Sequence, residues 1–418
     1  MGNYLKLVRP RLGGPLRRST CAGPRGRAVV RIKAIPIAAA LLLLLITQTT
    51  IGKYNGGIGT PYDPYRIETP EDLNDIGNHQ DDWDKNFILV NDVNLAEYTG
   101  TQFKIIGPFS GVFDGNNHKI LNFTWSSTGR HNIGLFGYVS VGGQIKNLGM
   151  EIVDVNGVNG GVVGALVGDN HGTITGCYST GNVAGQYDVG GLVGTNHHGS
   201  TVTNCHSSSR VSGSYVGGLI GFNIGVIANC YSTSSVLGTD YVGGLVGVND
   251  AGEIANCYSI GSVSGRYETG GLVGGNTRMI TNCYSSGSVT GKDYVGGLVG
   301  RSNGTITKSY STGRVMGTGY HVGGLLGRNS EGTIEASFWD IETSGQLKSA
   351  GGEPKTTAEM KTKNTFTLFG WDFVEVWGIG EHQTYPYLRT EPVGDSNHDK
   401  KVDFLDLAIL ASHWLEEH

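Results

Sequence analysis

A nearly constant interval separates copies of the phrase Gly-Leu-Val-Gly through the middle of the chain. From the first complete period onward the closing glycines are 26, 27, 26, 27, 26 and 27 residues apart. They are Gly168, Gly194, Gly221, Gly247, Gly274, Gly300 and Gly327. A fixed period of about 20–50 residues is typical of stacked repeat proteins, in which one unit cannot bury its apolar face alone. The interval therefore predicts a continuous stack of equivalent units.

Each period repeats the same residue types in the same order. An isoleucine or valine comes first: Ile174, Val202, Ile227, Ile254, Ile280, Ile306 and Ile334. A small residue follows three positions later: Cys177, Cys205, Cys230, Cys257, Cys283, Ser309 and Ser337. A valine occupies the next slot: Val183, Val211, Val236, Val263, Val289 and Val315. A tyrosine leads into a double glycine: Tyr187, Tyr215, Tyr241, Tyr267, Tyr294 and Tyr320.

These slots predict an all-β fold, a parallel β-solenoid with one coil of about 26–27 residues per repeat. The apolar patches are short and β-branched, and no stretch shows helical periodicity. Coils about 4.8 Å apart give a stack of roughly 35–40 Å for seven or eight coils. The 69 glycines lack the strict three-residue spacing of collagen. We expect them at corners with positive φ or close backbone packing.

An asparagine two residues after most closing glycines predicts a ladder. The members are Asn170, Asn196, Asn223, Asn249, Asn276 and Asn329, and Ser302 interrupts the series. Asparagine tolerates the left-handed conformation and hydrogen-bonds to copies of itself, so this row is interpreted as a turn ladder.

The cysteine row has three interpretations. Buried free thiols are favoured, because the cysteines lie about one coil apart and stacked side chains point in parallel. Disulfide pairing stays open as a second interpretation, although five cysteines cannot all pair. Zinc binding is disfavoured because zinc sites usually place two thiols at short sequence spacing.

The tyrosine row and the histidines also allow two interpretations each. Tyrosines in a line either stack on sugar rings or pack beside the glycine corners, and packing is favoured. His171, His197 and His198 follow the closing glycines of two neighbouring coils. They form either a weak metal site or, as the favoured interpretation, exposed turn residues. Five acids occupy different slots, so no catalytic face is predicted: Asp169, Asp188, Asp240, Asp250 and Glu253.

The first 52 residues contain nine Lys and Arg residues and no Asp or Glu. The apolar run of residues 34–46 is too short to span a bilayer, which needs about 20 residues. Residues 1–52 are therefore predicted to be a secretory signal cleaved near Gly52, with the true start near Val29. An uncleaved membrane anchor is the alternative. We expect an extracytoplasmic chain, secreted or on the cell surface, with no membrane span after cleavage.

Removal of residues 1–52 leaves 22 basic against 36 acidic residues, because 31 − 9 = 22, and a formal charge of −14. This charge argues against nucleic acid as a partner, because phosphate binding needs a basic surface.

The flanks of the repeat predict caps, since an open solenoid end exposes unpaired strand edges. Residues 53–160 are assigned to an N-terminal cap and irregular first coils, and residues 338–392 to a C-terminal cap. Thr69 followed by Pro70 predicts a helix start, as does the Thr356-Thr357 pair. The Asp-Gly-Asn-Asn stretch at residues 114–117 predicts a hairpin-like turn.

Residues 395–406 have the spacing of a calcium loop, followed by an amphipathic helical sequence. The predicted Ca²⁺ ligands are Asp395, Asn397, Asp399, the Lys401 carbonyl, Asp403 and Asp406. Position 6 of the loop, usually glycine, is Lys400. Residues 393–418 resemble half of a type I dockerin or an EF-hand. The resemblance implies calcium binding and a cohesin-like partner, although dockerins carry two such loops.

The phrase GLVG-x-N-x-G-x-I-x-N-C-Y-S resembles the GLUG motif of bacterial exported proteins across residues 134–337, and residues 161–337 are assigned to a GLUG-repeat solenoid. The resemblance implies a cell-surface or secreted β-solenoid of the kind found in large adhesin-like or protease-associated proteins, without a known active site. We expect a non-catalytic scaffold that binds an extracellular polysaccharide or a surface protein. The alternative is a polysaccharide-degrading hydrolase or lyase, or an accessory of one. A purely structural coat element is a third interpretation.

Overall fold

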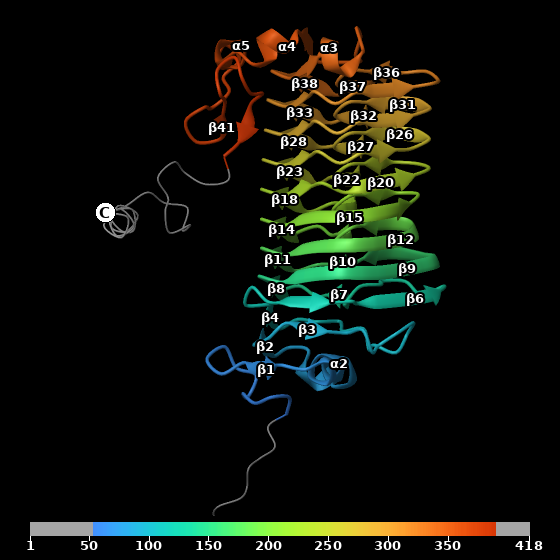
Figure 1. Ribbon diagram of the computed structural model, residues 1–418, viewed down its shortest axis with the longest axis vertical. Helices are drawn as coiled ribbons and strands as arrows, with labels where there is room; N and C mark the ends of the chain where they lie inside the picture. Colours follow the sequence, from blue (N-terminus) through green and yellow to red (C-terminus); the bar gives the residue numbers. More distant parts are fainter. Residues whose placement is uncertain (1–52, 390–418) are drawn as a thin grey trace, which may run out of the picture. The chain divides into compact units, whose positions relative to one another are not determined.

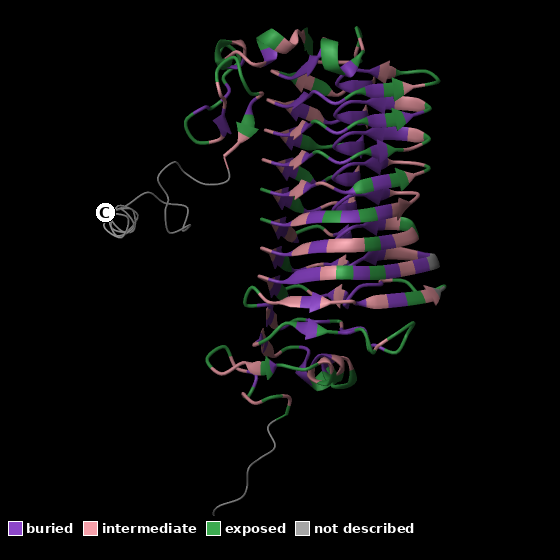
Figure 2. Ribbon diagram, viewed as in Figure 1, coloured by how far each residue is buried: buried purple, intermediate pink, exposed green. Residues whose placement is uncertain are grey.

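Residues 53–389 are described by the computed structural model, and residues 1–52 and 390–418 lie outside the described part. Within it, short strands of successive coils pair in parallel and form three long sheets (Figure 1). Apolar side chains fill the interior of the coils, and the buried positions recur from coil to coil (Figure 2). The predicted parallel β-solenoid is confirmed.

Sheet A contains eleven parallel strands among the described residues. In order they are β1 (Tyr65–Ile67), β2 (Asn86–Leu89), β4 (Val112–Asp114), β8 (Gln144–Lys146), β11 (Thr173–Thr175), β14 (Thr201–Thr203), β18 (Val226–Ala228), β23 (Glu253–Ala255), β28 (Met279–Thr281), β33 (Thr305–Thr307) and β38 (Thr333–Glu335). The predicted isoleucine and valine row is the centre of this sheet, where each residue pairs with its copy, as Ile227 does with Ile254. Its alternation of buried and more exposed residues follows from the two-residue period of a strand.

Sheet C contains eight parallel strands in the described chain. They are β7 (Phe136–Val139), β10 (Val167–Asn170), β13 (Val193–Asn196), β17 (Ile220–Asn223), β22 (Val246–Asn249), β27 (Val273–Asn276), β32 (Val299–Ser302) and β37 (Leu326–Asn329). The residue after each closing glycine forms one register row here: Tyr138, Asp169, Thr195, Phe222, Val248, Gly275, Arg301 and Arg328. The repeat leaves this residue free to vary.

Sheet B collects the remaining parallel strands and bends over two faces of each coil, since β12 pairs with both β15 and β16. Its strands are β3 (Val93–Asn94), β5 (Lys119–Leu121), β6 (Thr124–Thr128), β9 (Gly149–Gly164), β12 (Tyr178–Gly190), β15 (His206–Gly213), β16 (Val216–Gly217), β19 (Tyr231–Ser232), β20 (Ser235–Gly238), β21 (Val242–Gly243), β24 (Tyr258–Ser259), β25 (Val263–Ser264), β26 (Tyr267–Gly270), β29 (Tyr284–Ser285), β30 (Val289–Gly291), β31 (Asp293–Gly296), β34 (Tyr310–Ser311), β35 (Val315–Gly317), β36 (Val322–Gly323), β39 (Phe338–Asp340) and β40 (Glu353–Lys355).

The helices lie at the two ends of the described coils (Figure 1). They are α2 (Pro70–Asn78), α3 (Ile341–Ser344), α4 (Thr357–Met360) and α5 (Lys363–Thr367), with a short 3₁₀ turn, η1 (Gln80–Asp82), and an antiparallel pair, β41 (Trp377–Gly378) with β42 (Tyr387–Leu388). Both predicted helix starts are confirmed, because Thr69 and Thr356 each form a capping box. Within residues 53–389 no helix is long and apolar enough to cross a membrane.

The predicted hairpin at residues 114–117 is wrong. Strand β4 before it pairs with β2 and β8 in sheet A, whereas β5 after it pairs with β3 and β9 in sheet B. Asn116 and Asn117 have positive φ, as a tight turn requires, but the turn joins two faces of one coil. Pairing between coils prevails over the local hairpin preference.

The asparagine row forms a buried amide ladder inside sheet C. The Nδ2 of Asn170, Asn196, Asn223 and Asn249 each donates to Oδ1 of the next copy at 2.7–2.8 Å. Asn276 donates to Ser302 Oγ at 3.1 Å. The predicted hydrogen bonding is confirmed, but the predicted left-handed conformation is wrong. The positive φ falls one residue before the cysteine slot: Asn204, Asn229, Asn256, Asn282, Lys308 and Ala336.

The five solenoid cysteines are free and buried, as predicted. Each backbone N–H of Cys177, Cys205 and Cys230 donates to Sγ of the next cysteine at 3.4 Å. Burial raises the pKa of the Cys257 thiol well above its ordinary value. These thiols are therefore packing and hydrogen-bonding groups.

A second aromatic row follows the cysteines and was not predicted from the sequence. Its rings are nearly parallel, with centroids 4.6–5.1 Å apart and inclinations of 3–7°. The members are Tyr178, His206, Tyr231, Tyr258, Tyr284 and Tyr310. Trp371, Trp377 and Tyr385 cover Tyr310, and Tyr310 Oη donates to the Pro386 carbonyl. The C-terminal segment thus closes one end of the stack.

Candidate functional site

The tyrosines before the double glycine form two rows, not the single row that was predicted. Register in sheet B places Tyr215, Tyr241 and Tyr294 at one corner position, together with Asp188, Glu268 and His321 of the other coils. The coils that read Tyr-Asp-Val, Tyr-Glu-Thr and Tyr-His-Val carry one residue more between tyrosine and glycine. Counting back from the double glycine would have identified Asp188 and Glu268 as replacements for tyrosine at this corner.

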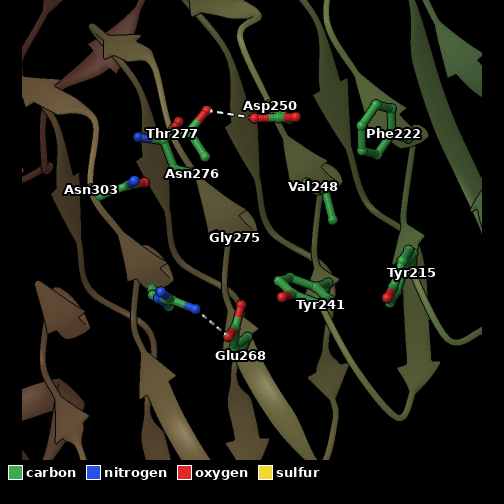
Figure 3. Close-up of a pocket in the computed structure, with 11 residues that line it drawn as sticks. Tyr215, Phe222, Tyr241, Val248, Asp250, Glu268, Gly275, Asn276, Thr277 and Asn303 are labelled. Atoms are coloured by element: carbon green, nitrogen blue, oxygen red, sulfur yellow. Dashed lines mark hydrogen bonds and ion pairs between the residues drawn. The ribbon is translucent and has the colours of Figure 1, made fainter. Parts of the chain in front are cut away.

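A pocket of about 300 Å³ lies where this corner row meets the variable row of sheet C. Figure 3 shows Tyr215, Tyr241 and Glu268 from the corner beside Phe222, Val248 and Gly275 from the strands. The same pocket is lined by Asp250, Asn276, Thr277, Arg301 and Asn303. It is therefore built from four consecutive coils and mainly from positions that differ between repeats.

The missing side chain of Gly275 makes room in the pocket. Its neighbours in the register row are Val248 and Arg301, so the backbone here accepts larger residues. A Cβ at Gly275 would lie 2.8 Å from Cδ1 of Tyr241 and 3.3 Å from Oε2 of Glu268. Glycine thus lets the tyrosine ring and the carboxylate lie directly against the strand.

Glu268 is the charged centre of the pocket and is only 8% exposed. Its Oε1 lies 3.2 Å from Nη1 of Arg301, whereas its Oε2 is buried without a hydrogen-bond partner among the described residues. Burial raises the pKa of Glu268 above its ordinary value, and Arg301 opposes the shift. Oε2 is therefore a buried acceptor whose hydrogen bond the described part of the chain does not supply.

Two tyrosine rings and a second polar pair complete the pocket. The rings of Tyr215 and Tyr241 are 4.9 Å apart in an edge-to-face arrangement. Thr277 Oγ1 donates to Oδ1 of Asp250 at 2.9 Å (Figure 3). The pocket therefore presents aromatic surface, one cation, two carboxylates and the exposed side-chain amide of Asn303. This set suits a polar ligand with an apolar face.

The residues predicted as sites from the sequence have different outcomes. All six predicted calcium ligands, Asp395 to Asp406, lie outside the described residues.

His171 and His197 come together with Asp169, whose side-chain oxygen is within 4.8 Å of a nitrogen of each. His198 is exposed and does not belong to this group. Burial, and to a lesser extent the charge of Asp169, raises the pKa of Asp188 to about 6. That the five acids form no catalytic face stays a prediction.

The chain is thus a parallel β-solenoid with a pocket formed by the variable positions of its repeats. The family profile of the GLUG motif matches residues 185–212, 212–237, 238–264, 265–290 and 293–316. The chain therefore carries GLUG motif repeats, and the residues that line the pocket all fall within the matched segments.

Two curated relatives share sequence with the chain. A glycine-rich protein of Evansella cellulosilytica, provisionally described as a membrane protein, is 35% identical over an alignment 435 positions long. The alignment covers 85% of this chain and 49% of the relative. Halomucin of Haloquadratum walsbyi is 33% identical over 151 residues, which cover 34% of this chain and 2% of that protein. The chain spans about half the length of the first relative and a small part of the second.

Two solved structures are similar to the chain. One is a Bacteroides ovatus protein provisionally described as an immunoglobulin A1 protease, with a TM-score of 0.48, 22% identity, and coverage of 81% of this chain and 96% of that one. The other is an IgA1 protease with a TM-score of 0.42, 16% identity, and coverage of 80% of this chain and 26% of that one.

Proposed function

We propose that the chain is an exported or cell-surface β-solenoid that binds an extracellular glycan in the pocket of Tyr215, Tyr241, Glu268 and Arg301. The observation that carries the proposal is the buried, unpartnered Glu268 Oε2 next to the ring of Tyr241, which packs edge-to-face with Tyr215. A sugar presents hydroxyl groups at its rim and C–H groups on its faces, so it matches a carboxylate acceptor next to aromatic surface.

The size of the pocket supports a short ligand segment. A volume of about 300 Å³ is at the lower end of the range for small-molecule sites, about 300–1,000 Å³. Arg301 would donate to a ring oxygen or a carboxylate, and the exposed Asn303 offers an amide group at the same opening. One or two sugar units of a longer chain would occupy the pocket, while the remainder lies along the sheet.

The location and the tail of the chain are parts of the same proposal. The basic and apolar run of residues 1–52 directs export, and residues 395–406 bind Ca²⁺ through the six predicted ligands. The tail would attach the solenoid to a cohesin-like partner or to a surface assembly. Calcium titration of the full chain and of an Asp395→Ala, Asp399→Ala variant tests this part independently of glycan binding.

Glycan-array binding of the full chain tests the pocket. We expect binding to at least one class of polysaccharide, with loss of at least about tenfold in affinity in Tyr241→Ala and Glu268→Gln. Glu253→Gln is the matched control, because Glu253 is exposed on sheet A away from the pocket. Equal binding by all three variants would place the glycan elsewhere, and absence of binding to any glycan would reject the proposal.

The alternative function is hydrolysis or cleavage of a polysaccharide. Two carboxylates, Asp250 and Glu268, line one pocket, and the raised pKa of Glu268 is the property that a general acid needs. Release of reducing sugar from the glycans that bind, abolished in Glu268→Gln and retained in Glu253→Gln, would establish the alternative. Glycan binding without release of reducing sugar would reject the hydrolytic alternative and leave the chain a binding protein.

A further inference from the structure

The geometry points to a divalent transition-metal site formed by Asp169, His171 and His197, distinct from the pocket and from the predicted calcium tail. Asp169 Oδ1 lies 2.8 Å from Nε2 of His197 and 3.5 Å from Nε2 of His171. The three ligand atoms lie within 4.8 Å of one another. Ligands of one zinc-like ion lie about 3 Å apart, so small side-chain shifts would complete the site.

The stacking of coils explains why these side chains meet. Asn170 pairs with Asn196 in sheet C, so His171 and His197, which follow them, occupy the same position of adjacent coils. Their rings are 3.9 Å apart and inclined by 14°. Asp169 precedes the buried Asn170, so its side chain and that of His171 emerge beside each other.

One oxygen of Asp169 and the hydroxyl group of Thr195 lack hydrogen-bond partners in the described part of the chain. Asp169 Oδ1 is buried and makes no hydrogen bond among the described residues, since His197 Nε2 is close but poorly aligned. Thr195, the next residue of the same register row, has a buried Oγ1 that also lacks a partner in the described chain. A bound cation would satisfy the carboxylate oxygen, and a water on the cation would satisfy the hydroxyl group.

Neighbouring residues hold the ligands in place. Asn132 Nδ2 donates to Asp169 Oδ2 at 3.4 Å, which leaves Oδ1 to face the histidines. The ring of Tyr138 stacks on His171, with centroids 4.8 Å apart. Such outer contacts are typical of metal ligands, whose orientation they fix.

The donor set selects the class of cation. Two imidazoles and one carboxylate suit Zn²⁺ and similar first-row ions, whereas Ca²⁺ and Mg²⁺ prefer sites made only of oxygen. Three protein ligands leave at least one coordination position for water or for an exogenous ligand. The cation would also join two adjacent coils on the outside of sheet C.

Isothermal titration of the metal-stripped full chain with zinc sulfate tests the inference. We expect one equivalent of Zn²⁺ to bind outside the tail, and affinity to fall at least about tenfold in Asp169→Asn, His171→Ala and His197→Ala. His198→Ala is the matched control because His198 is exposed beside the cluster, and the Asp395→Ala, Asp399→Ala variant controls for the tail. Both controls should keep this zinc equivalent.

A second measurement on the unaltered chain removes the dependence on variant folding. Zn²⁺ should protect His171 and His197, but not His198, from modification by diethyl pyrocarbonate, read by peptide mass spectrometry. The inference is overturned if zinc uptake is unchanged in the His171→Ala and His197→Ala variants, if no uptake occurs at millimolar zinc, or if the three histidines are modified equally.

Discussion

The side-chain amide of Asn223 donates a hydrogen bond to Oδ1 of Asn249, 2.7 Å away on the next coil. The same Asn223 accepts at its own Oδ1 from Asn196 and from the backbone N–H of Gly225. Asn170, Asn249 and Asn276 likewise bind the next coil and a turn of their own coil. The ladder joins sheet C to the turn that leads into sheet A.

We expect Asn223→Ala to destabilise the solenoid by about 2–4 kcal/mol, because several buried polar groups lose their partners at once. The loss should be smaller in Asn223→Ser, since Ser302 occupies the same position in another coil and accepts from Asn276. Chemical denaturation followed by circular dichroism measures both variants. Equal losses for Ala and Ser would show that packing, rather than hydrogen bonding, determines the effect.

His206 is the histidine of the stacked aromatic row. Burial lowers its pKa below the ordinary value, so the folded chain binds fewer protons than the unfolded chain at mildly acidic pH. The contribution of His206 to the free energy of unfolding is therefore fully present above about pH 6.5, the pKa in the unfolded chain. This contribution is lost as the pH falls through the lowered pKa of the folded chain. His206→Tyr should therefore be more stable than the natural chain at pH 5, and the difference should shrink at pH 8.

Thermal unfolding at the two pH values checks this prediction. The five other members of the stacked row are tyrosines. The ring centroids of Tyr178 and Tyr231 lie 5.0 and 4.6 Å from that of His206, so tyrosine fits the stack. Tyr231→His is the reciprocal variant and should increase the sensitivity to acid. A constant difference between His206→Tyr and the natural chain from pH 5 to pH 8 would contradict the prediction.

We expect serine to replace Cys257 with little change in the free energy of unfolding. Cys257 Sγ accepts from the Cys230 N–H at 3.4 Å and donates to the Ala255 carbonyl at 3.1 Å. Ser309 makes both kinds of bond in its own coil, with the Cys283 N–H and the Thr307 carbonyl. Cys257→Ser should change the free energy of unfolding by less than about 1 kcal/mol, whereas Cys257→Val should cost about 1–3 kcal/mol through the orphaned N–H. A larger loss for serine than for valine in denaturant melts would refute this account.

Gly275→Ala should reduce glycan affinity without much change in stability. The new methyl group would push the Tyr241 ring away from the strand and fill the base of the pocket. We expect affinity to fall at least about tenfold, with a stability change below about 1 kcal/mol because a side-chain ring can move. Met279→Ala is the control, as Met279 is exposed on sheet A in the same coil. If Gly275→Ala leaves the affinity unchanged while Tyr241→Ala abolishes binding, the ligand does not reach Gly275.

The repeat predicts the frame of this fold well because parallel stacking places each residue on its own copy. The isoleucine, valine, cysteine and asparagine rows are all register rows of the structure. Sequence could not assign the backbone conformation of the asparagines. Two asparagine rows exist, and composition does not reveal that the one before the cysteine slot has positive φ while the one in sheet C is extended.

The pocket was missed for a different physical reason. Alignment by residue type pairs tyrosine with tyrosine, whereas the register in the structure is constant when residues are counted back from the double glycine. Glu268 therefore looked unrelated to Tyr241, although both occupy the same corner position. The pocket also needs the absence of a side chain at Gly275, and in a chain so rich in glycine this position does not stand out.

The four-coil origin of the pocket has an evolutionary consequence. Since every coil offers the same edge to the next, recombination between repeats inserts or removes a whole coil while the hydrogen-bonding frame stays continuous. Such an event between Tyr241 and Arg301 would change which side chains line the pocket. The lining could thus be replaced without a single substitution in the interior.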